Sequence, residues 1–305
     1  MRLPAVLLAV PVAALALSGC APTAASDDGV LRVVASTSVY GDVAEAIAGD
    51  HAEVRSIVTS TAQDPHSYEV TARDRLELER ADLVVYNGGG YDPFVETVLA
   101  AMAAAPVSVS AIEVAGLGDD HDHDHDDEGH HHLEGANEHV WYDLHVVADV
   151  AERIADELAT LDPVHADDFA ANAGEFLAGL ESVEAELAAL AERASGLGVV
   201  MTEPVPGYLL GEAGFRDLTP AGFAEAVEEG TDVSPALLAA TLAVVADAAL
   251  VTDNPQTGGP ETADVREAAE RAGIPVVDML ELLPEGSTYL EWMRDNIAAL
   301  AAALP

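Results

Sequence analysis

The 305-residue chain has very little positive charge: its 12 basic residues are all arginine, and 55 residues are acidic. The formal net charge of −43 excludes a nucleic-acid-binding protein, because contacts to phosphate need a positive surface. A positive mean hydropathy of +0.19 and periodic apolar blocks argue against a disordered acidic chain. The single cysteine, Cys20, cannot form an internal disulfide bond and needs another explanation.

Long hydrophobic runs are also missing, except at the N-terminus. There Arg2 precedes an apolar stretch over residues 3–17, and Leu-Ser-Gly-Cys follows at 17–20. The stretch is shorter than the roughly 20 apolar residues of a transmembrane helix and has the order of a signal peptide. Its ending looks like a bacterial lipobox, which predicts lipidation of Cys20; the alternative is an ordinary cleaved signal with a chance cysteine. We expect a signal peptide over 1–20, a flexible leash over 21–29, and an extracytoplasmic protein anchored to the cell membrane by lipid.

Beyond the leash, short runs rich in β-branched residues alternate with helical patterns. The expected strands are residues 31–36, 54–59, 81–86 and 107–110, and then 199–202, 248–252 and 274–277. The expected helices of the first half are residues 39–47, 73–80, 91–104 and 146–161. Alternation of this kind predicts parallel sheets that are covered by helices on both faces.

A long helical pattern separates the two alternating halves. Asp162-Pro163 is typical of an N-cap followed by proline at the first helical position, and the pattern continues to about Ala194. We predict an α/β fold with two Rossmann-like lobes joined by a long rigid helix, in agreement with about 150 residues per domain. The predicted parts are an N-terminal lobe over 30–161, a linking helix over 162–195 and a C-terminal lobe over 196–305.

One segment of the first lobe, residues 119–138, has almost nothing to bury. It holds six histidines and nine acidic residues and is predicted to be a solvated, low-complexity loop. Its alternating His and Asp could bind several ions weakly, and the alternative is an acidic spacer that only keeps the protein soluble. We predict that it collects or senses zinc through an auxiliary set of histidines: His121, His123, His125, His130, His131 and His132.

Polar residues follow several predicted strands, which is where parallel sheets bind ligands. His66 comes after the second strand, His139 follows the acidic loop, and Glu203 follows the first strand of the second lobe. Imidazole nitrogen suits Zn, Fe, Ni and Mn, and carboxylate oxygen shifts the preference towards harder ions. Each residue alone also has an ordinary explanation, as a surface histidine or as a charge at a helix N-terminus.

The ordered combination of motifs is more specific than any one of them. The lipobox, Asp64-Pro-His-Ser-Tyr-Glu69, the His-rich loop and Glu138-His-Val-Trp-Tyr-Asp143 resemble the zinc and manganese family of substrate-binding lipoproteins of ABC importers. The resemblance extends over nearly the whole mature chain. It implies that the protein captures a metal ion and delivers it to an ABC permease. It also implies that His66 and His139 are the first two ligands and that Glu203 is the third, where the family carries His or Glu.

The fourth ligand position departs from the family pattern. The family often carries an Asp a few residues beyond its last strand, whereas this loop reads Asp278-Met-Leu-Glu281. We assign Glu281, because its carboxylate would compensate the charge of the cation as the family's Asp does. Asp253 in the neighbouring loop, Asp278 itself, or a water molecule are the alternatives.

Three classes of function have to be distinguished: a metal receptor, a metal-dependent hydrolase, and an adhesin-like lipoprotein that acts in cell adhesion. A bound metal can activate water, but the sequence has no His-Glu-x-x-His motif or paired second metal set. We therefore predict a receptor, no enzyme activity, and a monomer.

The identity of the ion depends on two features that disagree. Glu203 in place of a third histidine gives a harder, manganese-like ligand set, whereas the imidazoles of the loop favour zinc along the Irving–Williams order. Because the loop is the larger feature, zinc (Zn²⁺) is the predicted ion and manganese (Mn²⁺) the alternative.

Overall fold

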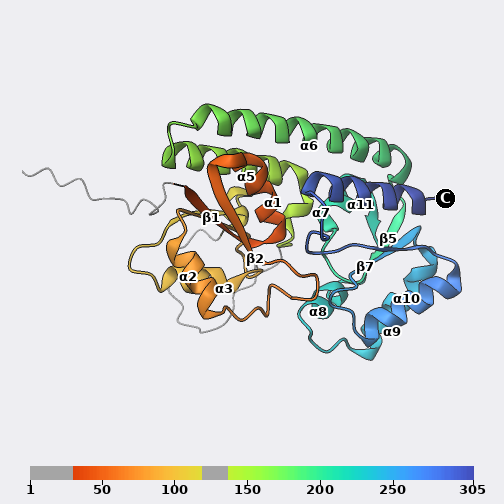
Figure 1. Ribbon diagram of the computed structural model, residues 1–305. Coiled ribbons are helices and arrows are strands. Elements are labelled where there is room, and N and C mark those ends of the chain that lie inside the picture. Colours follow the sequence, from red (N-terminus) through yellow and green to blue (C-terminus); the bar gives the residue numbers. More distant parts are fainter. Residues whose placement is uncertain (1–29, 119–136) are drawn as a thin grey trace, which may run out of the picture.

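The computed structural model describes residues 30–118 and 137–305. The predicted signal peptide, the leash and Cys20 lie outside these residues, and so do the six histidines of the auxiliary loop. Figure 1 shows two lobes side by side, with two long helices along one side of the molecule. In the part of the chain that is described, no helix combines the length and apolar character needed to cross a bilayer.

The first lobe is built on a parallel sheet with the strand order β2-β1-β3-β4. Its strands are β1 (Leu31–Thr37), β2 (Ala52–Val58), β3 (Leu83–Tyr86) and β4 (Val107–Ser110). Its helices are α1 (Ser38–Ala48), α2 (Ala72–Arg80), α3 (Pro93–Ala100), α4 (Ala111–Val114) and α5 (Leu144–Leu161). Val33 packs with α1 and α5, whereas its neighbour Val34 packs with α2 and α3. Helices therefore cover both faces of the sheet, as the alternation of strands and helices predicts.

The second lobe repeats this plan with the strand order β6-β5-β7-β8, again fully parallel. Its strands are β5 (Gly198–Met201), β6 (Arg216–Asp217), β7 (Leu250–Asp253) and β8 (Val276–Asp278). Its helices are α7 (Gly207–Glu212), α8 (Phe223–Glu228), α9 (Pro235–Val244), α10 (Pro260–Ala272) and α11 (Tyr289–Ala303). Three 3₁₀ turns complete the described elements: Gly49–His51, Val140–Tyr142 and Val245–Asp247.

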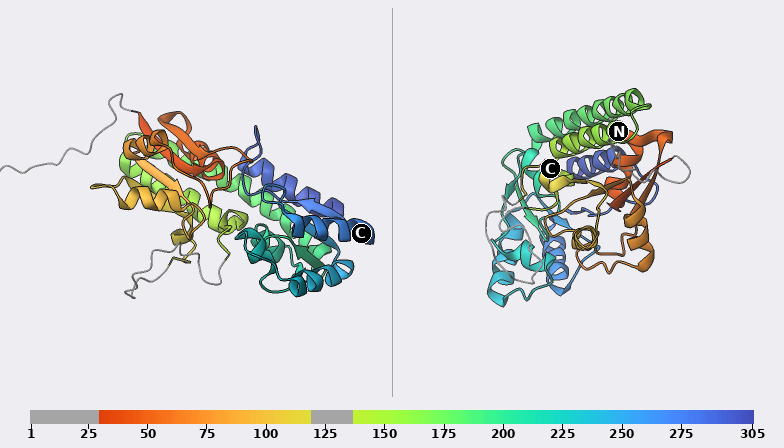
Figure 2. Two further views of the ribbon diagram at one scale, coloured as in Figure 1. Left: turned by 90° about the horizontal axis from the view of Figure 1, so that it is seen from below. Right: turned by 90° about the vertical axis from the view of Figure 1, so that its left-hand side faces the viewer.

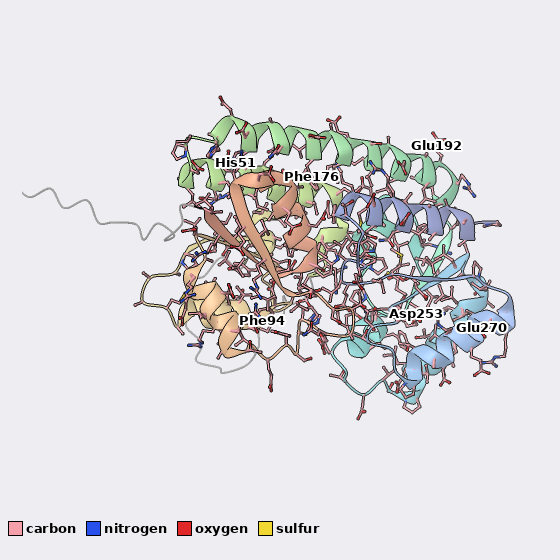
Figure 3. The ribbon with its side chains drawn as sticks, viewed as in Figure 1. His51, Phe94, Phe176, Glu192, Asp253 and Glu270 are labelled. Carbon is pink, nitrogen blue, oxygen red and sulfur yellow. The ribbon has the colours of Figure 1, made fainter. Side chains whose placement is uncertain are left out.

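Helix α6 (Ala166–Ala194) is the longest element and contacts both lobes. Its 29 residues span about 43 Å, at 1.5 Å per residue. Figures 1 and 2 show it antiparallel to α5 and running on over the second lobe beside α11. Buried residues recur every three or four positions, and Phe176 lies on the side that faces the lobes (Figure 3). One apolar core therefore continues from the first lobe into the second.

The start of α11 also ties the lobes together. The backbone N–H of Tyr289 donates to Asp42 Oδ2 of α1 at 2.7 Å, and the Tyr289 hydroxyl donates to the Trp141 carbonyl at 2.6 Å. Two helices thus connect the lobes, and the predicted α/β fold with two parallel sheets and a long connecting helix is confirmed.

The predicted start of the long helix is wrong. Its first residue is Ala166, and Pro163 lies in the turn before it. The Asp162 backbone N–H donates to the Leu158 carbonyl, and this is the last helical hydrogen bond of α5. The Asp162 carboxylate accepts from the Val164 N–H and lies 2.5 Å from His165 Nδ1. These local hydrogen bonds stabilise a tight turn between α5 and α6, which explains why the helix begins three residues later.

Candidate metal centre

The candidate ligands come from loops that follow strands in both lobes. His66 lies in the loop after β2, and His139 lies directly before the turn at Val140–Tyr142. Glu203 follows β5, and Glu281 follows β8. The structure therefore brings two imidazoles from the first lobe towards carboxylates from the second, at the boundary between them.

The His66 ring is held by the residue two positions before it. Asp64 Oδ1 accepts the backbone N–H of His66 at 2.9 Å and lies 3.1 Å from His66 Nδ1. The other nitrogen, Nε2, lies 2.5 Å from Glu138 Oε1. The ring also packs edge-on against Tyr91, with 4.9 Å between ring centroids. The contacts with Asp64 and Tyr91 fix the orientation of the ring. Because Asp64 holds Nδ1, Nε2 is the nitrogen that could bind a metal.

His139 repeats this arrangement with an amide in place of the carboxylate. Asn137 Oδ1 accepts the His139 backbone N–H at 3.0 Å and lies 2.7 Å from Nδ1. The side chain is fully buried, and Nε2 lies 2.8 Å from Glu228 Oε1 of the second lobe. Both histidines thus have Nδ1 held from two residues upstream and Nε2 close to a carboxylate.

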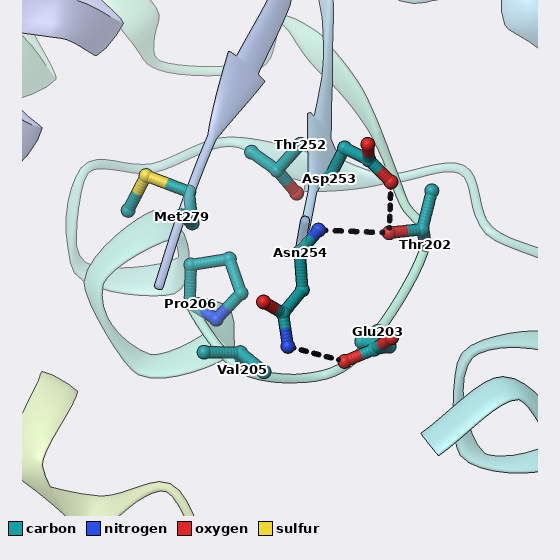
Figure 4. A pocket seen from close by; sticks show the side chains of 8 residues that line it. All are labelled: Thr202, Glu203, Val205, Pro206, Thr252, Asp253, Asn254 and Met279. Atoms are coloured by element: carbon teal, nitrogen blue, oxygen red, sulfur yellow. Dashed lines mark hydrogen bonds between the residues drawn. The ribbon is translucent and has the colours of Figure 1, made fainter. Parts of the chain in front are cut away.

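The two carboxylates of the second lobe are joined through one amide. Asn254 Nδ2 donates to Glu203 Oε2 at 2.7 Å and to Glu281 Oε1 at 2.5 Å. The Thr257 hydroxyl also donates to Glu203 Oε1, and Gln256 Oε1 accepts the backbone N–H of Glu281 at 2.8 Å. Figure 4 shows Asn254 donating to Glu203 from the end of β7. Glu203 and Glu281 are each 2 % exposed, so these donors compensate for water that the carboxylates have lost.

The carboxylates around the imidazoles favour protonated rings. Burial lowers the pKa of His66, but the hydrogen bonds to Asp64 and Glu138 outweigh it and raise the pKa to about 11. Burial opposes protonation of His139 as well, and the nearby Glu228 carboxylate more than offsets it, so its pKa is raised. A cation that bound these nitrogens would therefore have to displace protons from them.

The carboxylates of the second lobe hold protons more readily than exposed ones. Burial raises the pKa of Glu203 to about 7, although the hydrogen bonds from Thr257 and Asn254 act against this. Burial also raises the pKa of Glu281, although His139 and His66 lower it. Near neutral pH Glu203 is therefore about half protonated, and a cation that bound its carboxylate would replace that proton.

The spacing of the ligand atoms shows which candidates the structure brings together. Ligand atoms of His66, Asp64 and Glu281 all lie within 4.8 Å of one another, and so do those of His66, Glu138 and Glu228. His139 is close to His66, with 6.4 Å between ring centroids, and its nitrogen faces Glu228. Asn254 donates to both Glu203 and Glu281. Glu281 and His66 therefore have metal-like spacing, whereas in the described residues His139 pairs with Glu228 and Glu203 accepts from Asn254 and Thr257.

The alternative fourth ligands have a different role. Asp253 Oδ2 accepts from Arg266 at 2.6 and 2.9 Å, and its Oδ1 accepts from the Thr202 hydroxyl at 3.0 Å. Asp278 is paired with the same guanidinium. Both carboxylates thus belong to an ion-pair network beside the second sheet, and Glu281 is the candidate whose carboxylate lies near the imidazoles.

Sequence reasoning missed Glu138, Glu228, Asn254 and Gln256. Glu138 stands beside His139 in the motif but has no spacing signal of its own. Glu228 belongs to an acidic stretch with Glu225 and Glu229, and only the fold shows that its carboxylate lies beside His139. The sequence alone does not place the Asn254 amide between two glutamates that are distant along the chain.

Two parallel α/β lobes with imidazoles and carboxylates gathered at their boundary define the class of bilobal solute-binding proteins with a site for a cation. Residues 33–303 match the sequence model of one such family, described as "Zinc-uptake complex component A periplasmic" (ZnuA). The chain belongs to this family of metal-binding components of ABC importers.

Relatives of this chain are named for different metals. The chain is 27 % identical over 307 residues to the manganese-binding lipoprotein MntA of Halalkalibacterium halodurans, covering 97 % of this chain and 96 % of the relative. It is 28 % identical over 189 residues to the iron-binding protein YfeA of Yersinia pestis, covering 61 % and 58 % of the two chains. The resemblance to lipoproteins of ABC importers is thereby confirmed.

Solved structures agree with the fold. A mutant of the laminin-binding adhesin (Lmb) of Streptococcus agalactiae superimposes with a TM-score of 0.72 at 23 % identity, covering 90 % of this chain and 100 % of that one. At this identity the similarity supports the two-lobe architecture.

Proposed function

We propose that this protein captures a divalent metal ion outside the cytoplasm and delivers it to the membrane permease of an ABC importer. The observation that carries the proposal is the pair of imidazoles, His66 and His139, whose Nδ1 atoms are held from two residues upstream and whose Nε2 atoms face carboxylates. The names of the relatives support this proposal, because they describe metal-binding lipoproteins. By the same comparison, lipid attachment at Cys20 would anchor the protein outside the membrane.

The proposed ligands are His66, His139, Glu203 and Glu281. Carboxylates beside two neutral imidazoles would compensate the charge of a dication, which matters in a buried site. Asn254 would keep both carboxylates oriented once the ion is bound, as outer partners do in other metal sites. The ion would replace protons on the histidine nitrogens.

We propose zinc as the ion. Affinity at a mixed nitrogen and oxygen site favours zinc over manganese, and the six histidines of residues 121–132 add to the preference for zinc. Manganese is the second candidate, because the described site is rich in carboxylates and the relative MntA is named for manganese. No hydrolytic activity is proposed, since the buried carboxylates would complete the ligand shell instead of leaving a position for water.

Delivery would need only a modest movement of the lobes. Helices α6 and α11 both pack across the boundary, and a continuous apolar core resists a wide hinge. Contact with the permease would withdraw the ligands of one lobe from those of the other. X-ray scattering should therefore show nearly the same radius of gyration with and without bound ion, and a large change would contradict this mechanism.

Direct competition between metals tests the proposal. Purified protein is titrated with Zn²⁺ and with Mn²⁺ against a chelator of known affinity, at equal free ion concentrations. We expect one tightly bound ion per chain and a preference for zinc. A preference for manganese would support the metal-receptor function but contradict zinc as the ion. The absence of a tight site for either metal would favour the adhesin-like alternative.

A further inference from the structure

The carboxylate nearest to His139 belongs to neither proposed ligand of the second lobe. It is Glu228, the last residue of α8, which lies at the boundary between the lobes (Figure 1). Glu228 Oε1 approaches His139 Nε2 to 2.8 Å, and the Glu228 side chain is 14 % exposed. The remaining acidic residues of this stretch, Glu225 and Glu229, are exposed.

The two close atoms are not aligned with each other. Among the described residues, neither His139 Nε2 nor Glu228 Oε1 has a hydrogen-bond partner in acceptable geometry, and both atoms are buried. The two atoms form a close ion pair rather than an aligned hydrogen bond, so part of the cost of burying them remains. This is the arrangement of groups that face a common third point, as the ligands of one ion do.

Glu228 also has metal-like spacing to the other histidine. Its ligand atom lies within 4.8 Å of those of His66 and Glu138. Because Glu228 is also 2.8 Å from His139, one carboxylate of the second lobe is within reach of both imidazoles. Glu281 groups with His66 and Asp64 and also lies close enough to His139 to interact with it electrostatically, whereas Glu203 contacts Asn254.

On these grounds we propose that Glu228 is itself a ligand of the captured cation, brought to the two histidines by α8. The inference rests on the proposed function, because it concerns the same site. The Glu228 carboxylate would approach the ion from α8. It would also raise the number of oxygen ligands, which shifts the preference of the site towards harder ions.

The position of Glu228 gives the direction of the effect. Glu228 Oε1 lies 2.8 Å from His139 Nε2, so an ion bound to that nitrogen at about 2.1 Å would lie within reach of the carboxylate. The negative charge of Glu228 would then attract the double positive charge of the ion, which an uncharged glutamine amide would not do. Removing the carboxylate should therefore weaken metal binding, although it also frees His139 from a competing partner.

The test compares Glu228→Gln with Glu229→Gln in the full chain. Both substitutions remove one negative charge from the same end of α8, but only the first removes a carboxylate beside a histidine. With Zn²⁺ in a chelator competition, Glu228→Gln should bind at least about tenfold more weakly, the lower end of what losing a metal-site partner costs. Glu229→Gln should match the wild type within about twofold, since exposed charges interact weakly.

A second readout separates a ligand from a merely structural residue. Co²⁺ is bound in place of zinc, and its visible absorption is recorded, because band intensity depends on coordination number. Glu228→Gln should change this spectrum, while Glu229→Gln should not, and thermal unfolding without metal checks that both variants are folded. Glu228→Asp, which keeps the charge but shortens the side chain, replaces Glu228→Gln if that variant does not fold, and it too should bind zinc more weakly.

Three results would overturn the inference. An unchanged affinity and an unchanged Co²⁺ spectrum in Glu228→Gln would show that Glu228 is not a ligand. Tighter binding would show that the carboxylate competes with the ion. Failure of the wild-type protein to bind zinc or Co²⁺ one-to-one would instead remove the proposed function, and this is seen before any variant is compared.

Discussion

Metal uptake should release protons, and its strength should therefore depend steeply on pH. Before an ion binds, the pKa of His66 is raised to about 11 and that of Glu203 to about 7. Both groups are protonated below these values, and a ligand must lose its proton to bind a metal. The affinity should therefore rise as the pH rises and fall as the site becomes protonated.

The two values set the size of the effect. Between pH 6 and pH 8 the proton on His66 alone changes the apparent affinity by about 100-fold, and Glu203 contributes about another tenfold. Together they predict an increase of about 1,000-fold over this range. At pH 7 binding should release about 1.5 protons from these two residues, and His139, whose pKa is also raised, should increase the number.

Two assays check the prediction. Chelator competition at pH 6, 7 and 8 gives the apparent affinity for zinc, corrected for the known protonation of the chelator. Calorimetry in two buffers with different heats of ionisation counts the released protons at pH 7. The variant Glu203→Gln should bind zinc more weakly and release about half a proton less.

A change in affinity of less than about tenfold between pH 6 and pH 8, or the release of no protons, would contradict this prediction. Either result would mean that the imidazoles are not protonated beforehand or that they do not bind the ion. A proton count that is unaffected by Glu203→Gln would remove only Glu203 from the ligand set.

Three further predictions concern other parts of the molecule. Asn254→Ala removes the donor shared by Glu203 and Glu281, so zinc should bind about 10- to 100-fold more weakly by chelator competition, whereas the remote variant Asn172→Ala should bind normally. Phe176→Ala opens a cavity beneath α6, where Phe176 is 4 % exposed, and should lower the free energy of unfolding by about 3–5 kcal/mol in urea titrations; a loss below about 1 kcal/mol would contradict the packing. Deleting residues 119–136 should remove weakly bound zinc in equilibrium dialysis and leave the tight site intact, and loss of tight binding would show that the two are not separate.

The architecture could be predicted because its signals are local. The alternation of β-branched runs with amphipathic segments places the main strands within a few residues of their observed bounds. The exception is β6, Arg216–Asp217, whose two exposed residues carry no strand pattern. The start of α6 was misplaced for a related reason: side-chain hydrogen bonds of Asp162 favour a turn where sequence alone suggests a helix cap.

The site was only partly predictable, because its geometry depends on contacts across the chain. His66 and His139 belong to short motifs in which the residue two positions earlier holds Nδ1, a local arrangement that sequence can indicate. Glu228 is 89 positions from His139 and stands in an ordinary acidic stretch. The sequence favoured Glu281 over Asp253 and Asp278, but only the structure shows that Arg266 pairs with both aspartates.

The central claim is that one ion is held by His66, His139 and carboxylates of the second lobe. The most direct measurement is zinc X-ray absorption on the full chain loaded with less than one equivalent, so that the tightest site is filled first. We predict two imidazole nitrogens and otherwise oxygen neighbours around zinc, with one imidazole fewer in His139→Ala. A shell of three or more imidazoles that is unchanged in His139→Ala would place the ion elsewhere and contradict the account.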